Sequence, residues 1–338
     1  MITSRDQLER VVTEGWYRGA RWLWLLLPLA GVFAVLSAAR RYYWRRRGAA
    51  PLPVPVVVIG GITVGGTGKT PVIISLALAL KSTGIKVAIV SRGYGGQVGD
   101  VAMPVTPQSL ASEVGDEPLL IAQRTACPVF VCRDRSQAVR LAADHGADLV
   151  LSDDGLQHYA MHRDWEIIVL DGVRGTGNGW LLPAGPLREG RWRLNTVNGL
   201  LERNGEQPNT RFFYRPVAVR HLASGQRIDL PTALVQWGTT AEAPKSVTAL
   251  TGLGQPEQFF ALLEREGFCI ERHTVGDHRA LDLALLAQIN TDIVLMTEKD
   301  AVKLSPTFDD RLWCLEIDAV LPEDLLHSVI NQFGKSEP

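Results

Sequence analysis

The stretch from residue 54 to residue 80 constrains the fold more than any other part of the chain. Val54–Ile59 is a short β-branched run that ends in two glycines, and a helical pattern continues through Leu80. Between them lies the segment TVGGTGKTP. A strand, a glycine loop and a helix in this order are typical of a phosphate-binding loop, because glycines let backbone N–H groups approach the phosphates and the helix N-terminus adds positive potential. The predicted nucleotide-binding residues are Thr63, Val64, Gly65, Gly66, Thr67, Gly68, Lys69 and Thr70.

Two side chains of this loop have predicted roles. Lys69 would reach the β- and γ-phosphates, and the Thr70 hydroxyl would ligate Mg²⁺. The strict phosphate-loop pattern has glycine where this chain has Thr63, so we expect Gly65 and Gly66 to supply the flexibility instead. The alternative is a glycine turn with an incidental lysine.

Alternating strand and helix patterns continue from residue 86 to residue 170 and predict a parallel sheet. One buried strand, over residues 148–151, is followed by Asp153 and Asp154, where open α/β sheets bind ligands. We interpret the two aspartates as a Walker-B-like pair that holds Mg²⁺, with a solvated turn as the alternative. Asp171 follows another strand in the same way, and both a metal role and a structural role stay open for it.

The nucleotide is predicted to be ATP. Proteins specific for guanine usually carry N-K-x-D after a late strand, but here Lys299 directly precedes Asp300. The spacing required for guanine recognition is therefore not met.

With 338 residues, the chain is long enough for about two domains. The predicted fold class is α/β: a P-loop NTPase-like parallel sheet domain, a smaller C-terminal α/β domain and an N-terminal membrane-associated helix. The four predicted segments are a membrane-anchoring helix (1–50), the P-loop domain (51–210), a β-hairpin linker (211–231) and the C-terminal domain (232–338). Four cysteines without a C-x-x-C pair indicate neither a zinc site nor a disulfide framework.

The first 50 residues differ in charge from the rest. They contain nine arginines and three acidic residues, so the remaining chain carries a net charge of −7, which argues against nucleic acid as a partner. Eighteen uncharged residues, Trp22 to Ala39, lie between basic flanks. As a helix they would reach about 27 Å, against a hydrocarbon core of about 30 Å. We favour an interfacial anchor, with a membrane span or a buried core helix as alternatives.

Six motifs in order resemble the tetraacyldisaccharide 4′-kinase (lipid A 4′-kinase) family: TVGGTGKTP (63–71), SRGYGG (91–96), GDEP (115–118), DDGLQH (153–158), LPAGPLRE (182–189) and TEKDAVK (297–303). The resemblance implies transfer of the ATP γ-phosphate to the 4′-hydroxyl of an acylated glucosamine disaccharide 1-phosphate. It also implies a peripheral or monotopic place on the inner membrane, with the catalytic domain on the cytoplasmic leaflet.

The resemblance assigns further site residues. It makes Asp116, in a glycine-preceded loop, the catalytic base, and it makes His278 the partner that tunes it, because a carboxylate at a pKa of about 3.9 is a weak base. Lys69 is the third catalytic residue. Arg92 and Arg188 are candidates for binding substrate phosphates, with surface ion pairs as the alternative. The predicted metal ligands are Thr70, Asp153, Asp154 and Glu117.

Two other function classes stay open. A membrane-peripheral P-loop ATPase would use hydrolysis to switch a protein partner and would need no small acceptor. A scaffold with a vestigial nucleotide pocket is disfavoured, because Lys69, Thr70, Asp153 and Asp154 are all present.

Overall fold

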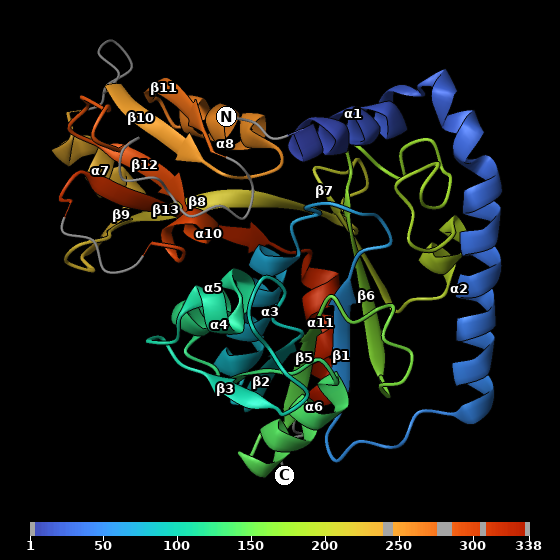
Figure 1. Ribbon diagram of the computed structural model, residues 1–338. Coiled ribbons are helices and arrows are strands. Elements are labelled where there is room, and N and C mark those ends of the chain that lie inside the picture. The colour runs from blue at the N-terminus through green and yellow to red at the C-terminus, as the bar shows by residue number, and fades with distance from the viewer. Residues whose placement is uncertain (1–3, 239–245, 276–285, 305–308, 335–338) are drawn as a thin grey trace.

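The computed structural model describes residues 4–238, 246–275, 286–304 and 309–334. Its centre is one continuous sheet in the order β11-β10-β12-β13-β8-β7-β6-β1-β5-β2-β4-β3, with β9 paired to β8. Figure 1 shows the two halves of this sheet joined by the long strand β8, and a helical arm on the outer side of β6. The mixed, mostly parallel sheet with helices agrees with the predicted α/β class.

The N-terminal half of the sheet is built around β1 (Val56–Gly60), which lies parallel to both β5 and β6. All five β1 residues are buried, as expected for a central strand covered on both faces. The other strands of this half are β2 (Val87–Ser91), β3 (Met103–Val105), β4 (Val129–Val131), β5 (Leu149–Asp153), β6 (Trp165–Asp171) and β7 (Gly199–Arg203).

Strand β8 (Arg211–His221) carries the sheet into the C-terminal half. Its first residues pair in parallel with β7, and its length pairs antiparallel with β13 (Leu312–Val320). The antiparallel pair of β8 and β9 (Arg227–Asp229) confirms the predicted hairpin. The remaining strands of this half are β10 (Ser246–Thr251), β11 (Cys269–Thr274) and β12 (Val294–Thr297).

Helices cover both faces of the N-terminal half. Alternate residues of β1 enter different cores: Val57 and Ile59 pack with α3 (Lys69–Ser82) and α5 (Asp116–Thr125), whereas Val56 and Val58 pack with α6 (Arg135–Asp144). The short helix α4 (Ala111–Val114) precedes α5, and the 3₁₀ helix η2 (Arg191–Asn195) precedes β7. In the C-terminal half, α7 (Leu230–Gln236) and α8 (Pro256–Arg265) share one core, and α10 (Glu298–Ala301) belongs to the opposite one.

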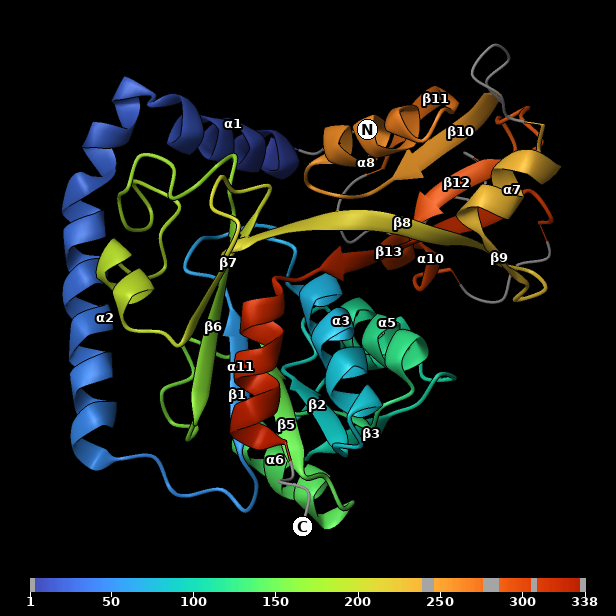
Figure 2. The ribbon, with the colours of Figure 1, turned by 180° about the vertical axis from the view of Figure 1, so that it is seen from behind.

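The last helix, α11 (Glu323–Phe333), returns to the N-terminal half. Its buried residues Leu325 and Val329 belong to the same core as Val72 of α3 and Ile167 of β6. Figure 2 shows α11 beside α3 against this face of the sheet. The domain boundaries derived from the sequence stay a prediction, but α11 packs on the P-loop half.

The N-terminal arm consists of α1 (Ser4–Arg18), the 3₁₀ helix η1 (Arg21–Leu26) and α2 (Leu27–Arg47). Pro28 lies in the first turn of α2, where the missing backbone N–H removes no intrahelical hydrogen bond. It therefore lies at the change from 3₁₀ to α geometry and does not break the helix. The arm is attached to the body: Trp16 Nε1 donates to the Pro183 carbonyl at 3.0 Å, and the rings of Trp24 and Trp180 meet edge to face at 5.4 Å.

Most of the apolar surface of the arm faces outward. Within the described residues, Arg21–Arg47 is the one helical segment long and apolar enough to cross a membrane, and only 11% of its apolar window is buried. The alternative of a buried core helix is therefore wrong. The choice between an interfacial anchor and a span stays a prediction.

Candidate active site

The glycine loop between β1 and α3 has a backbone conformation that depends on its glycines. Gly65 and Gly68 have φ angles of +105° and +88°, which L side chains rarely adopt, and α3 begins at Lys69. Gly65 and Gly66 are exposed, and a Cβ on either would meet nothing within 4 Å. The loop is therefore open where phosphates would approach its backbone.

A second loop supports the first half of the phosphate loop. Val64 N donates to the Pro186 carbonyl at 2.8 Å, and Arg188 N donates to the Ile62 carbonyl at 2.6 Å. The backbone of the motif 182–189 is thus hydrogen-bonded to the start of the glycine loop. This pairing brings the Arg188 side chain to the site.

Lys69 and Arg188 meet at the same carboxylate. Lys69 Nζ lies 3.4 Å from Asp154 Oδ1, and Arg188 Nη1 lies 2.8 Å from Asp154 Oδ2. Burial pushes the pKa of Asp154 upward, but the two positive charges outweigh it and hold that pKa well below its usual value. In this state Asp154 holds the lysine at the mouth of the loop.

Asp153 has the opposite surroundings. Its side chain is 2% exposed, and Oδ2 accepts from Ser91 Oγ at 3.2 Å, while Oδ1 is buried without a hydrogen-bond partner. Burial raises the pKa of Asp153 to about 7, and the negative charges of Glu117 and Asp154 act in the same direction. An unsatisfied buried carboxylate oxygen close to other carboxylates fits a site that a cation completes.

These residues fit Mg²⁺ bound together with a nucleotide. Within the described ranges no group of three or more His, Cys, Asp or Glu side chains could hold a metal alone. A magnesium ion bound with a nucleotide takes only one or two protein carboxylates and completes its shell with substrate phosphates and water. Besides Asp153 Oδ1, the hydroxyl of Thr67 in the glycine loop is also buried without a partner.

Asp116 occupies a basic environment contributed by the C-terminal half. Its Oδ2 lies 3.9 Å from Lys299 Nζ and 4.0 Å from Lys303 Nζ, and Lys299 also approaches Glu117 Oε1 at 3.6 Å. The buried Asp300 fixes Lys303, at 3.3 Å, and accepts hydrogen bonds from Thr251, Gly252 and Thr297. The motif 297–303 therefore faces the motif 115–118 directly.

The prediction that Asp116 lies in a loop is wrong, because it is the first residue of helix α5. Gly115, at φ +92°, ends the preceding segment, and Pro118 is compatible with the first turn of a helix. The loop around Gly93 and Gly96 packs on this point so closely that a Cβ on Gly115 would lie 2.7 Å from the Tyr94 carbonyl. Backbone packing between the two glycine motifs thus positions Asp116.

The other predicted residues have different outcomes. Thr70 lies in the first turn of α3 and is half-buried, next to Lys69. Arg92 is exposed at the edge of the glycine turn that follows β2. His278 lies outside the described residues. Its pairing with Asp116 stays a prediction.

The structure adds residues that motif reasoning did not single out. The guanidinium of the buried Arg135 donates to the Asp154 carbonyl at 3.0 Å, so it fixes the Walker-B-like turn, in which Asp154 has φ +48°. Burial lowers the pKa of His158 to about 4, so this histidine of motif 153–158 is neutral. The regular pattern of strand ends identified the aspartates, but no local pattern points to Arg135.

Asp171 has a structural environment. It is buried, forms an ion pair with Arg203 at the end of β7, and accepts from Val173 N at 3.1 Å. Arg203 lies over the ring of Tyr214, whose hydroxyl occupies the place that a Cβ on Gly68 would take, 1.9 Å away. Through these contacts Asp171 and Arg203 hold Tyr214 against Gly68 and so support the phosphate loop.

Comparisons with known proteins show the family and the fold to which this chain is similar. A family model described as "Tetraacyldisaccharide-1-P 4'-kinase" matches residues 22–334. A protein named tetraacyldisaccharide 4'-kinase from Aeromonas salmonicida is 42% identical over 323 residues, covering 94% of this chain and 95% of its own. One of the same name from Herminiimonas arsenicoxydans is 41% identical and covers 98% of both chains. The crystal structure of LpxK from Aquifex aeolicus, in complex with ATP, has a similar fold: TM-score 0.74, 24% identity, 92% of this chain and 99% of that chain.

Proposed function

This chain belongs to the tetraacyldisaccharide-1-P 4′-kinase family, and from that membership we propose the reaction and the residues that carry it. The protein is an ATP-dependent lipid kinase of lipid A biosynthesis, and it uses ATP and Mg²⁺. It transfers the γ-phosphate of ATP to the 4′-hydroxyl of a tetraacyl glucosamine disaccharide 1-phosphate. One O–P bond forms at the 4′-oxygen, the bond between the β- and γ-phosphates breaks, and ADP leaves.

The phosphate loop positions the triphosphate. Backbone N–H groups of Gly65 to Lys69 bind phosphate oxygens, and the Lys69 ammonium exchanges its contact with Asp154 for the γ-phosphate. Thr70 and Asp153 would hold Mg²⁺, which neutralises phosphate charge when bound. Arg188, which forms an ion pair with Asp154 in this structure, is the second cation that would bind the transferred phosphate.

Asp116 accepts the proton of the 4′-hydroxyl as general base. Lys299 and Lys303 keep its carboxylate in one orientation and stabilise its charge. Since α5 carries the aspartate and the segment after β12 carries the lysines, both halves of the sheet contribute to one site.

The arm brings this site to its lipid substrate. We place the apolar segment 22–39 in the cytoplasmic leaflet of the inner membrane, with its arginine-rich end among the head groups. The acyl chains of the acceptor then stay in the bilayer while the sugar reaches the phosphate loop.

The observation that carries this proposal is the convergence at Asp154. One carboxylate of the motif 153–158 contacts Lys69 of the phosphate loop and Arg188 of the motif 182–189. Three segments that carry the family resemblance are therefore in contact.

A label-transfer assay tests the function. The full-length protein is incubated with Mg-ATP labelled in the γ-phosphate and with the acylated disaccharide 1-phosphate in detergent, and the lipid fraction is analysed. The proposal predicts label on the lipid and little ATP turnover without it. Label found only in free phosphate, with turnover stimulated by a protein partner or bare membrane, would instead support the switch ATPase.

A further inference from the structure

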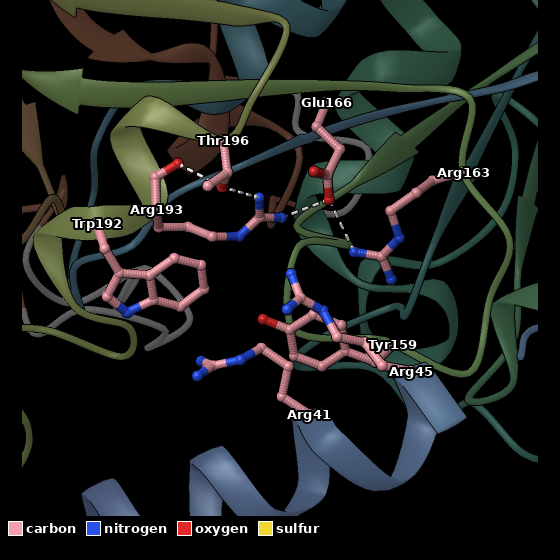
Figure 3. A pocket seen from close by; sticks show the side chains of 8 residues that line it. All are labelled: Arg41, Arg45, Tyr159, Arg163, Glu166, Trp192, Arg193 and Thr196. Atoms are coloured by element: carbon pink, nitrogen blue, oxygen red, sulfur yellow. Dashed lines mark hydrogen bonds and ion pairs between the residues drawn. The ribbon is translucent and has the colours of Figure 1, made fainter. Parts of the chain in front are cut away.

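A cavity of about 200 Å³ lies between the last turns of α2 and the body of the protein. Four arginines line it together with two aromatic residues: Arg41 and Arg45 from α2, Arg163 and Arg193 from the body, and Tyr159 and Trp192. Figure 3 shows Arg41 and Arg45 reaching from α2 toward the side chains of the body. The cavity therefore exists only while the arm is docked.

The body side of the cavity is held by buried ion pairs. Glu166 Oε1 accepts from Arg163 Nη1 at 3.0 Å and also from Arg193, whose side chain is 6% exposed. Arg193 also contacts Glu189 at 3.3 Å, and the Tyr159 hydroxyl donates to Glu189. Burial and that carboxylate raise the pKa of Tyr159 to about 12, so the phenol keeps its proton. These groups form a rigid, preorganised wall.

The arm side of the cavity carries the positive charges of Arg41 and Arg45. The Arg41 guanidinium stacks 4.2 Å from the Trp192 ring centre. Among the residues that the structure describes, neither Arg41 nor Arg45 forms an ion pair with a carboxylate. Four guanidinium groups thus face one lining carboxylate, Glu166, so the cavity has a net positive charge.

The cavity is separate from the phosphate loop. None of the residues that line the cavity belongs to the loop, and Glu166 pairs with Val58, the middle residue of β1, whereas the loop follows Gly60 at the carboxyl end of that strand. The cavity lies instead just beyond the apolar segment 22–39, at the depth where a membrane-bound arm would meet lipid head groups.

We propose that this cavity binds the phosphate ester of a membrane lipid head group. Planar guanidinium groups bind phosphate oxygens in pairs, and two of the four are already fixed by Glu166. The phosphate comes either from an anionic phospholipid of the bilayer or from the 1-phosphate of the acceptor, and only the second source rests on the proposed function. A phosphate bound in the cavity would contact both the arm and the body and so stabilise the docked arm at the membrane surface.

Vesicle flotation with the full-length protein tests the site without requiring catalysis. The double variant R41A/R45A removes the two arginines that the arm contributes to the cavity. The control R46A/R47A removes two arginines of the same helical turn, which lie on Tyr42 and Tyr43 instead and do not line the cavity. The vesicles contain phosphatidylcholine alone, phosphatidylcholine with phosphatidylglycerol, or phosphatidylcholine with the acylated disaccharide with or without its 1-phosphate.

We expect R41A/R45A to lose about tenfold in partitioning relative to R46A/R47A, as the loss of charge-assisted contacts implies. A loss on phosphatidylglycerol vesicles identifies the phospholipid as the source. A loss confined to the disaccharide that carries the 1-phosphate identifies the acceptor. R41K/R45K, which keeps the charge but not the paired hydrogen bonds, should fall between wild type and R41A/R45A.

Equal losses in R41A/R45A and R46A/R47A on every vesicle type would overturn the proposal, because the effect would then be general surface charge. An absent effect in both variants would overturn it too. Since flotation needs no turnover, a protein that fails to phosphorylate the acceptor would leave this result interpretable.

Discussion

Two adjacent aspartates show how the fold assigns different properties to identical residues. The negative charge of Asp154 is balanced by Lys69 and Arg188, whereas Asp153 is buried and its Oδ1 accepts no hydrogen bond from the described residues. The sequence identified the pair but left open which aspartate ligates Mg²⁺. We propose Asp153 as the Mg²⁺ ligand, because its Oδ1 has no hydrogen-bond partner among the described residues, whereas both oxygens of Asp154 contact cations until ATP draws Lys69 away.

Asp153 should make stability depend on pH. The unfolded chain ionises this group near pH 3.9 and the folded chain near 7, so between these values the folded state holds a proton that the unfolded state lacks. Its contribution to the free energy of unfolding therefore falls as pH rises from about 4 to about 7. Asp153→Asn should gain melting temperature relative to wild type as pH rises from 5 to 7, measured without Mg-ATP.

The exposed Asp144 provides the control for this measurement. Asp144→Asn should differ from wild type by a constant amount across the same pH range. If Asp153→Asn behaves in that way as well, Asp153 is ionised in the folded protein throughout and the assignment fails.

Asp116 is the residue on which turnover should depend most. Asp116→Asn keeps the shape of the side chain but removes the base, so kcat should fall about 10²- to 10⁴-fold with little change in the KM for ATP. Glu113→Gln, an exposed carboxylate in the preceding helix, should stay close to wild type. Steady-state kinetics with labelled ATP measures both, and wild-type kcat in Asp116→Asn would remove the aspartate from the mechanism.

The local sequence pattern predicts those strands and helices whose own residues show a regular pattern of burial. The β-branched run before the glycine loop became β1, and the loop and α3 followed as predicted. Strand β7 was not predicted, because two of its five residues are Glu202 and Arg203. Their charges are satisfied only by tertiary partners, Thr210 and Asp171, which no local pattern reveals.

The brace of Asp171, Arg203 and Tyr214 should matter for stability. Arg203→Ala leaves Asp171 buried without its cation, and breaking a buried pair costs about 3 kcal/mol or more. Urea unfolding should therefore show a lower midpoint for Arg203→Ala than for Arg211→Ala, an exposed arginine at the start of β8. Equal midpoints would mean that the pair contributes nothing to stability.

At the scale of the whole molecule, the sequence could not predict how its two halves meet. Asp116 and Lys299 are far apart in sequence, and their contact depends on β8 joining both halves into one sheet. The packing of α11 on the N-terminal core is equally non-local. The ordered motifs predicted the chemistry, but only three-dimensional pairing places the motif 297–303 beside Asp116.

The arm should hold the protein at membranes through its exposed apolar side chains. Leu25 and Val35 are 81% and 69% exposed. Replacing both by serine removes apolar area worth about 2 kcal/mol for each side chain, so partitioning into vesicles should fall at least tenfold. The matched control replaces Val101 and Val235, which are as exposed but lie on the body, and co-sedimentation with vesicles should show no change for it. Equal binding by both variants would show that the segment 22–39 does not enter the lipid.

The position of the added phosphate shows whether the protein carries out the proposed transfer. The full-length protein is incubated with Mg-ATP and the acylated disaccharide 1-phosphate, and the product is fragmented in a mass spectrometer. The account predicts a gain of one phosphate group, carried by the sugar ring that bears the 4′-hydroxyl. Consumption of ATP with an unchanged lipid mass, or a phosphate added to the ring that already bears the 1-phosphate, would contradict it.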